Sequence, residues 1–157
     1  VKVTKNGQIT AVKEGYASVT AKVTMNDKST YYSQTISIEV KEPYVTSGSA
    51  LSHYYGNGGV VVIPEDLGVM WIANQAFFDN DYITKIVIPE GVVTIGYEAF
   101  ASCDMLASIT LPSTLTEIGE GAFCNCALLD EIEIPDSVTY IDSTAFTKTG
   151  LALIPTV

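Results

Sequence analysis

The three cysteines are the residues of this 157-residue chain best suited to covalent or metal chemistry. Cys103 and Cys126 lie 23 residues apart, and Asn80 and Thr149 hold the same position one interval before and after them. A nucleophilic cysteine needs a nearby histidine base, and the single histidine, His53, lies outside this repeating region. We therefore expect the two cysteines to belong to a buried row of small groups that hydrogen-bond the turn backbone.

Two other interpretations of the cysteines are weaker. A disulfide between Cys103 and Cys126 fits the spacing, but equivalent positions in stacked repeats seldom present the required torsion. A metal site at Cys124 and Cys126 lacks a set of four ligands. We expect Cys124 to point away from Cys126 and to be partly exposed, and we expect no metal, cofactor or catalytic residue.

The densest acidic cluster consists of Asp130, Glu131 and Glu133. Glu131 and Glu133 would share the outward face of one strand, with their Cα atoms about 7 Å apart. Two carboxylates at such a distance can serve a glycosidase, provided that a walled cleft surrounds them and raises one pKa. A flat sheet face provides neither condition, so we interpret the pair as a solvated face and predict that the chain is not an enzyme.

A second group of acids, Asp79-Asn80-Asp81, alternates like part of a calcium loop. It lacks the glycine and the distal glutamate that such a loop requires. We therefore interpret these residues as a turn.

The second part of the chain repeats with a period of 23 residues. The clearest marker is an Ala-Phe pair, found at Ala76-Phe77, Ala99-Phe100, Ala122-Phe123 and Ala145-Phe146. An Ile-Pro or Leu-Pro pair precedes each of them. One unit of this length cannot bury its own apolar face, so the units must stack on one another as a solenoid.

Each unit is predicted to contain two short strands and a turn. Alternating residues closed by a proline mark the first strand, in 86–88, 109–111 and 132–134. A second short alternating run marks the second strand, in 93–95, 115–118 and 138–141. The stretch 96–100 is predicted to form a turn or a short helical segment, and Phe100, Phe123 and Phe146 are predicted to stack inside. The fold class is therefore mainly β, a short right-handed solenoid with parallel strands and short helical turns.

One unit reads Leu106-x-x-Ile109-x-Leu111-Pro112-x-x-Leu115-x-x-Ile118-Gly119-x-x-Ala122-Phe123-x-x-Cys126. This pattern resembles the BspA-like leucine-rich repeats of bacterial surface proteins, from about Gly59 to Pro155. The resemblance implies an extracellular adhesion module, secreted or attached to the cell surface, that binds a host or microbial protein or glycoprotein, including host extracellular matrix. A structural spacer and an accessory domain of a larger secreted enzyme are the alternatives.

Residues 1–42 differ from the repeats in their charge. They hold six lysines and four acids, whereas residues 43–157 hold two lysines and fourteen acids. Asn6-Gly7 is a hairpin signal between alternating strands. The segment Lys5–Ala21 resembles the C-terminal half of a group 2 bacterial immunoglobulin-like domain, which implies an antiparallel module. We expect three parts: a partial immunoglobulin-like module at 1–42, a linker and N-terminal cap at 43–58, and about four repeat units at 59–157.

The overall charge excludes several partners. The net charge is −10, and all eight basic residues are lysine, which argues against nucleic acid and against anionic lipid.

No apolar run is long enough to span a membrane, and the N-terminus is not a signal peptide. Since the chain does not begin with Met, we expect a piece of a longer protein or a processed product. An uncapped last repeat and missing partner strands predict a homodimer.

Two exposed groups could bind a partner. The first is the outward row of the first strands and its neighbours, which we call the ligand face; it consists of Val62, Lys85, Val87, Ser108, Thr110, Glu131 and Glu133. Its character changes from apolar to acidic along the units. The second is a tyrosine cluster before the repeats, which either caps the first unit or forms an aromatic patch; it consists of Tyr31, Tyr32, Tyr44, Tyr54 and Tyr55.

Overall fold

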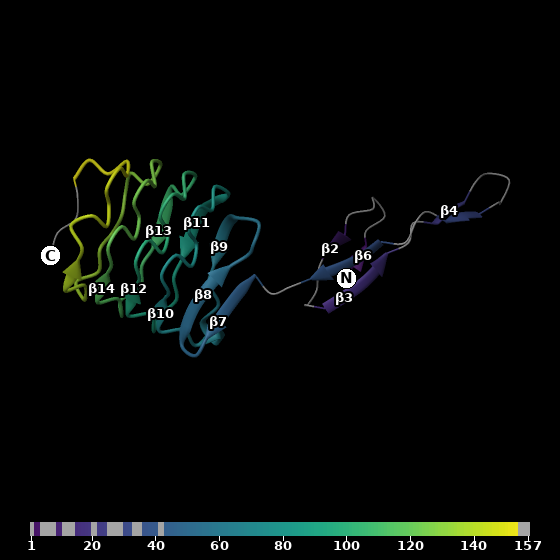
Figure 1. Ribbon diagram of the computed structural model, residues 1–157, viewed down its shortest axis with the longest axis horizontal. Helices are drawn as coiled ribbons and strands as arrows, with labels where there is room; N and C mark the ends of the chain where they lie inside the picture. Colours follow the sequence, from purple (N-terminus) through teal and green to yellow (C-terminus); the bar gives the residue numbers. More distant parts are fainter. Residues whose placement is uncertain are drawn as a thin grey trace. The chain divides into compact units, whose positions relative to one another are not determined.

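The chain divides into two compact units, Val1–Glu42 and Pro43–Val157. The computed structural model describes residues 43–153 and, before them, only the backbone of six short strands (Figure 1).

The strands of the first unit form three antiparallel pairs. They are β1 (Lys2–Val3) with β2 (Ile9–Thr10), β3 (Gly15–Val19) with β6 (Ile36–Val40), and β4 (Lys22–Thr24) with β5 (Thr30–Tyr32). The Asn6-Gly7 turn itself lies outside the described residues, but β1 and β2 pair on either side of it as the hairpin signal predicts. The immunoglobulin-like identity of this unit stays a prediction.

The second unit is a parallel β-solenoid with two sheets. One sheet begins with an antiparallel hairpin and continues in parallel; its strands are β7 (Tyr44–Ser47), β8 (Ala50–Tyr54), β10 (Trp71–Ile72), β12 (Thr94–Ile95), β14 (Glu117–Ile118) and β15 (Tyr140–Ile141). The other sheet is parallel throughout and contains β9 (Gly59–Val62), β11 (Ile83–Val87) and β13 (Ser108–Thr110). Figure 1 shows the coils following one another in chain order. The predicted parallel solenoid is therefore confirmed.

A column of stacked aromatic rings forms the centre of the core. Neighbouring ring centroids are 5.0 Å apart for Tyr54 and Phe77, 4.9 Å for Phe77 and Phe100, 5.3 Å for Phe100 and Phe123, and 5.2 Å for Phe123 and Phe146. The last two pairs are almost coplanar, with interplanar angles of 5°. The predicted phenylalanine stack is confirmed, and Tyr54 of the hairpin stacks on its first ring, as one of the two interpretations of the tyrosine cluster predicted.

The stretch 96–100 forms the predicted turn and not its helical alternative, so the short helical turns expected in the fold class are absent there. The one helix in residues 43–153 is the 3₁₀ helix η1 (Glu65–Leu67), which lies in the first repeat unit. In the turns, Gln75, Glu98 and Gly121 have φ of 57°, 48° and 59°, and a left-handed residue interrupts a right-handed helix. The backbone forms single-turn bonds along the chain, such as Ala99 N–H to Gly96 O at 3.3 Å, and alternates them with bonds to the next coil, such as Phe77 N–H to Ala99 O at 2.8 Å.

The predicted strand at 132–134 is also absent. In earlier coils Ile63 N–H donates to Val87 O at 3.1 Å, and Ile88 N–H donates to Thr110 O at 3.0 Å. Within the described residues, the equivalent bond from Leu111 N–H to the next coil is missing. Two differences account for this. Ile132 and Ile134 are only half-buried, whereas the equivalent Ile86 and Ile88 are buried, and the exposed Glu131 and Glu133 place two like charges on one face of the segment, where they repel each other.

The fourth coil remains attached through its other ladders. β15 pairs in parallel with β14, and Phe123 N–H donates to Ala145 O at 2.8 Å. The coil is therefore separated from its neighbour on one side only, beside β13.

Candidate functional site

The structure brings five residues of the ligand face onto one sheet. The register pairs Val62 with Val87 and Val87 with Thr110, so these three residues form a row across β9, β11 and β13. Lys85 and Ser108 pair in the adjacent row. Because neighbouring strands are about 4.8 Å apart, each row presents side chains close enough for a partner to contact together.

The apolar end of the ligand face is larger than the sequence suggested. Val60 pairs with Lys85 and is 65% exposed, and Val62 is 56% exposed. Val60 is not among the predicted residues of the ligand face, although its position two residues before Val62 on an alternating strand is a signal for it.

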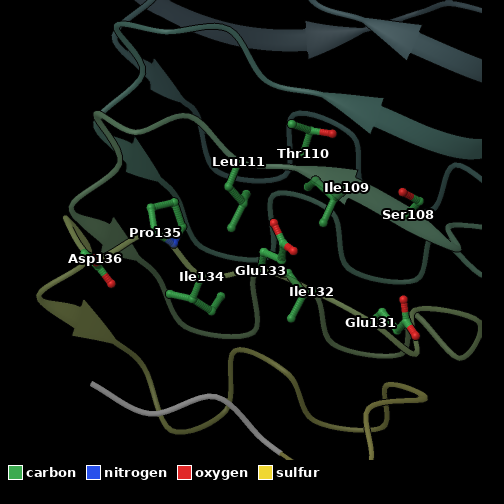
Figure 2. Close-up of a pocket in the computed structure, with 10 residues that line it drawn as sticks. All are labelled: Ser108, Ile109, Thr110, Leu111, Glu131, Ile132, Glu133, Ile134, Pro135 and Asp136. Carbon is green, nitrogen blue, oxygen red and sulfur yellow. The ribbon is translucent and has the colours of Figure 1, made fainter.

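The acidic end of the ligand face borders a cleft of about 500 Å³, which we call the β13 cleft. Its two walls are residues 108–111 and residues 131–136, and Figure 2 shows the two segments on either side of it. The cleft forms where the strand ladder is interrupted. The expectation of a flat face at Glu131 and Glu133 is therefore wrong.

The two glutamates beside the cleft are not placed like the carboxylate pair of a glycosidase. Both glutamates lie on the same wall, and the opposite wall carries only Ser108 and Thr110 as polar side chains. A glycosidase pair instead flanks the scissile bond from two sides.

The two buried cysteines bind the backbone as predicted. Cys103 Sγ donates to Phe77 O at 3.2 Å, and Cys126 Sγ donates to Phe100 O at 3.1 Å. All three cysteines are free thiols, and Cys124 is half-buried. Burial raises the pKa of both Cys103 and Cys126 to about 12, which favours the neutral thiol at neutral pH.

Metal ligands do not gather in the part of the chain that the structure describes, where no group of three or more His, Cys, Asp or Glu could hold an ion. Asp79-Asn80-Asp81 lies in a turn, where Asn80 Oδ1 accepts a hydrogen bond from Tyr82 N–H at 3.2 Å.

Some acids outside the ligand face stabilise the turns. The Glu90 carboxylate accepts bonds from Ser113 N–H at 3.0 Å and Ser113 Oγ at 2.9 Å, and these bonds lower the pKa of Glu90. Hydrogen bonds from Thr144 lower the pKa of Asp142 in the same way. Glu90 is exposed and Asp142 is half-buried, so hydrogen bonds and not burial hold these two carboxylates in place.

The tyrosine cluster caps the first coil in part. Tyr54 is buried on Phe77, and the rings of Tyr44 and Tyr54 are 5.3 Å apart. Burial and the proximity of Tyr54 raise the pKa of Tyr44 to about 12. Tyr55 is exposed beside His53, with ring centroids 4.3 Å apart, and the side chains of Tyr31 and Tyr32 lie outside the described residues.

A second surface that sequence reasoning missed lies on the larger sheet. Trp71, which is 43% exposed, borders a shallow hollow of about 560 Å³ together with Ser52, Asn74 and Thr94. The sequence feature that points to this surface is the single tryptophan, which stands directly before an isoleucine that faces inward.

The described part of the chain contains no helix long and apolar enough to cross a membrane.

Comparison with solved structures finds the same fold in three bacterial leucine-rich repeat proteins. The protein from T. pallidum is 30% identical, with a TM-score of 0.55 over 66% of this chain and 61% of its own. The protein from Bacteroides capillosus is 28% identical, with a TM-score of 0.59 over 71% of this chain and 96% of its own. A leucine-rich cell surface protein from Faecalibacterium prausnitzii is 34% identical, with a TM-score of 0.56 over 62% of this chain and 26% of its own.

This chain thus spans less than two thirds of the T. pallidum protein and about a quarter of the Faecalibacterium protein. A search of curated proteins gives no significant match. The family model described as the BspA-type leucine-rich repeat region matches residues 61–155 in six copies. The chain therefore belongs to the BspA-type leucine-rich repeat family.

Proposed function

We propose that this chain is a non-catalytic interaction module that binds a protein partner through the ligand face. The observation that carries the proposal is the pair of exposed valines on β9, Val60 and Val62, each of which begins a cross-strand row that continues over β11 and β13 to the β13 cleft. Exposed apolar side chains gathered on one face are typical of protein-binding surfaces. Leucine-rich repeat proteins generally bind proteins, which supports the same assignment.

The proposed location is extracellular, either secreted or attached to a bacterial cell surface. The similarity to the Faecalibacterium cell surface protein supports this location. The proposed partner is a host or microbial protein or glycoprotein, including extracellular matrix. A spacer role and an accessory role in a larger secreted enzyme are the alternatives, and neither requires an exposed apolar row.

The test compares two double variants against a panel of immobilised matrix proteins and glycoproteins. Val62→Lys with Val87→Lys alters the ligand face, whereas Trp71→Lys with Tyr140→Lys makes the matched change on the other sheet. We expect binding to weaken at least about ten-fold in the first variant and to stay within about two-fold in the second. The reverse pattern, or no difference between the variants, contradicts the proposed face.

The homodimer predicted from the sequence stays a prediction. Light scattering over a range of concentrations measures it directly, and a monomeric mass throughout contradicts it.

A further inference from the structure

We propose that the β13 cleft binds an extended peptide carrying basic side chains, which adds to the sheet as a strand beside β13. This inference rests on the proposed function, because the cleft is the acidic end of the ligand face. It specifies which kind of partner segment enters the cleft and how the backbone is recognised.

An unpaired strand edge is the first observation. β13 pairs with β11 on one side, and its other side faces the segment 131–136 without a backbone hydrogen bond in the described residues. The equivalent of the missing Leu111 N–H bond is made in both preceding coils. Backbone groups along this edge are therefore available to an added strand.

The space beside this edge is the second observation. The cleft measures about 500 Å³, within the range of 300–1,000 Å³ typical of binding sites. β13 has three residues, so an added strand of the same length spans about 10 Å. The half-buried Leu111, Ile132 and Ile134 provide apolar surface for one face of that strand.

The charge of the residues that line the β13 cleft determines which peptides are expected to bind there. The residues lining the cleft include Glu131, Glu133 and Asp136, all exposed, and no basic residue. An extended peptide presents alternate side chains to opposite sides, so alternating lysine and valine would place ammonium groups toward the acids and valines toward the isoleucines. Exposed charges of this kind favour encounter and specificity, and salt screens them.

The experiment uses three synthetic peptides and the full chain. The first is a capped hexapeptide of alternating lysine and valine, the second has glutamate in place of lysine, and the third is the lysine peptide N-methylated at alternate backbone nitrogens. We expect the lysine peptide to bind, and the glutamate and N-methylated peptides to bind at least ten-fold more weakly. Failure of the lysine peptide to bind, or equal binding after N-methylation, overturns strand addition.

Matched charge reversals locate the peptide. Glu131→Lys with Glu133→Lys should weaken the lysine peptide at least ten-fold, whereas Glu117→Lys with Glu120→Lys, which changes the net charge equally elsewhere, should change binding less than two-fold. Hydrogen exchange of the Leu111 amide should slow on binding in the unaltered chain. Equal losses in the two variants, or no slowing at Leu111, would show attraction to the net charge alone and overturn the inference.

The two proposals fail separately. If Val62→Lys with Val87→Lys abolishes protein binding while the lysine peptide does not bind, the proposed function stands and this inference is wrong. If the lysine peptide binds in the β13 cleft but no protein partner depends on Val62 and Val87, the apolar part of the proposed function is wrong.

Discussion

At the scale of single residues, Cys103 and Cys126 show how a reactive side chain is made structural. Each thiol is fully buried and bonded to a backbone carbonyl of the preceding coil. The recurrence of small polar residues at this position predicted the arrangement from the sequence alone. The burial of both thiols was predictable because equivalent positions in stacked repeats have the same environment.

The first prediction concerns the order in which the cysteines react. At pH 8, a pKa of about 12 leaves about one thiol in ten thousand ionised at Cys103 and Cys126, since the raised pKa favours the neutral form. Iodoacetamide should therefore label the half-buried Cys124 first and the other two only in denaturant. Peptide mass spectrometry over time measures this order, and simultaneous labelling of all three contradicts it.

The second prediction concerns a residue with left-handed backbone. Asp79 has φ of 59°, which costs an L-residue about 1–2 kcal/mol that glycine avoids, although glycine is more flexible when unfolded. Asp79→Gly should raise the free energy of unfolding by about 0.5–1 kcal/mol. Asp81→Gly, at a nearby exposed aspartate without positive φ, should lower it, and urea unfolding of both variants distinguishes the two effects. A lower stability of Asp79→Gly would contradict this account of the turn.

At the scale of elements, the strands were more predictable than the turns. Alternating apolar residues before Pro89 and Pro112 predicted β11 and β13 within a few residues. The turns were predicted as partly helical because Gln75 and Glu98 give no signal of positive φ, whereas glycine would have given one. Their conformation depends on hydrogen bonds to the next coil, which no local pattern reveals.

The third prediction tests the aromatic column. Phe123 is fully buried between two other rings, so Phe123→Ala should lower the free energy of unfolding by about 3–5 kcal/mol. Phe78 is 43% exposed, and Phe78→Ala should cost less than about 1 kcal/mol. Urea unfolding monitored by circular dichroism gives both values. Similar losses in the two variants would mean that the column contributes little.

The fourth prediction tests why the fourth coil lacks its strand. Residues 131 and 133 are equivalent to Ser108 and Thr110 of β13, one period earlier. Copying these residues with Glu131→Ser and Glu133→Thr removes the repulsion and should let the segment pair with β13. Hydrogen exchange at Leu111 should then slow without any peptide, and unchanged exchange contradicts a role for the two glutamates.

At the scale of the whole molecule, the 23-residue period determines the architecture. It predicted stacked coils with parallel strands, and both the sheets and the family match agree with it. The acid excess of residues 43–157 is divided between carboxylates that stabilise turns, such as Glu90, and exposed carboxylates beside the β13 cleft. The cleft itself was not predictable, because 132–134 alternates as the true strands do, and its missing hydrogen bonds to β13 are visible only in the structure.

The central claim is that the sheet of β9, β11 and β13 is the binding face. Hydrogen exchange of the full chain, measured alone and with a protein partner identified from the matrix panel, tests this claim most directly. The account predicts slowed exchange in 59–62, 83–87 and 108–111, with little change in β10, β12, β14 and β15. Protection confined to those four strands, with the smaller sheet unchanged, would contradict it.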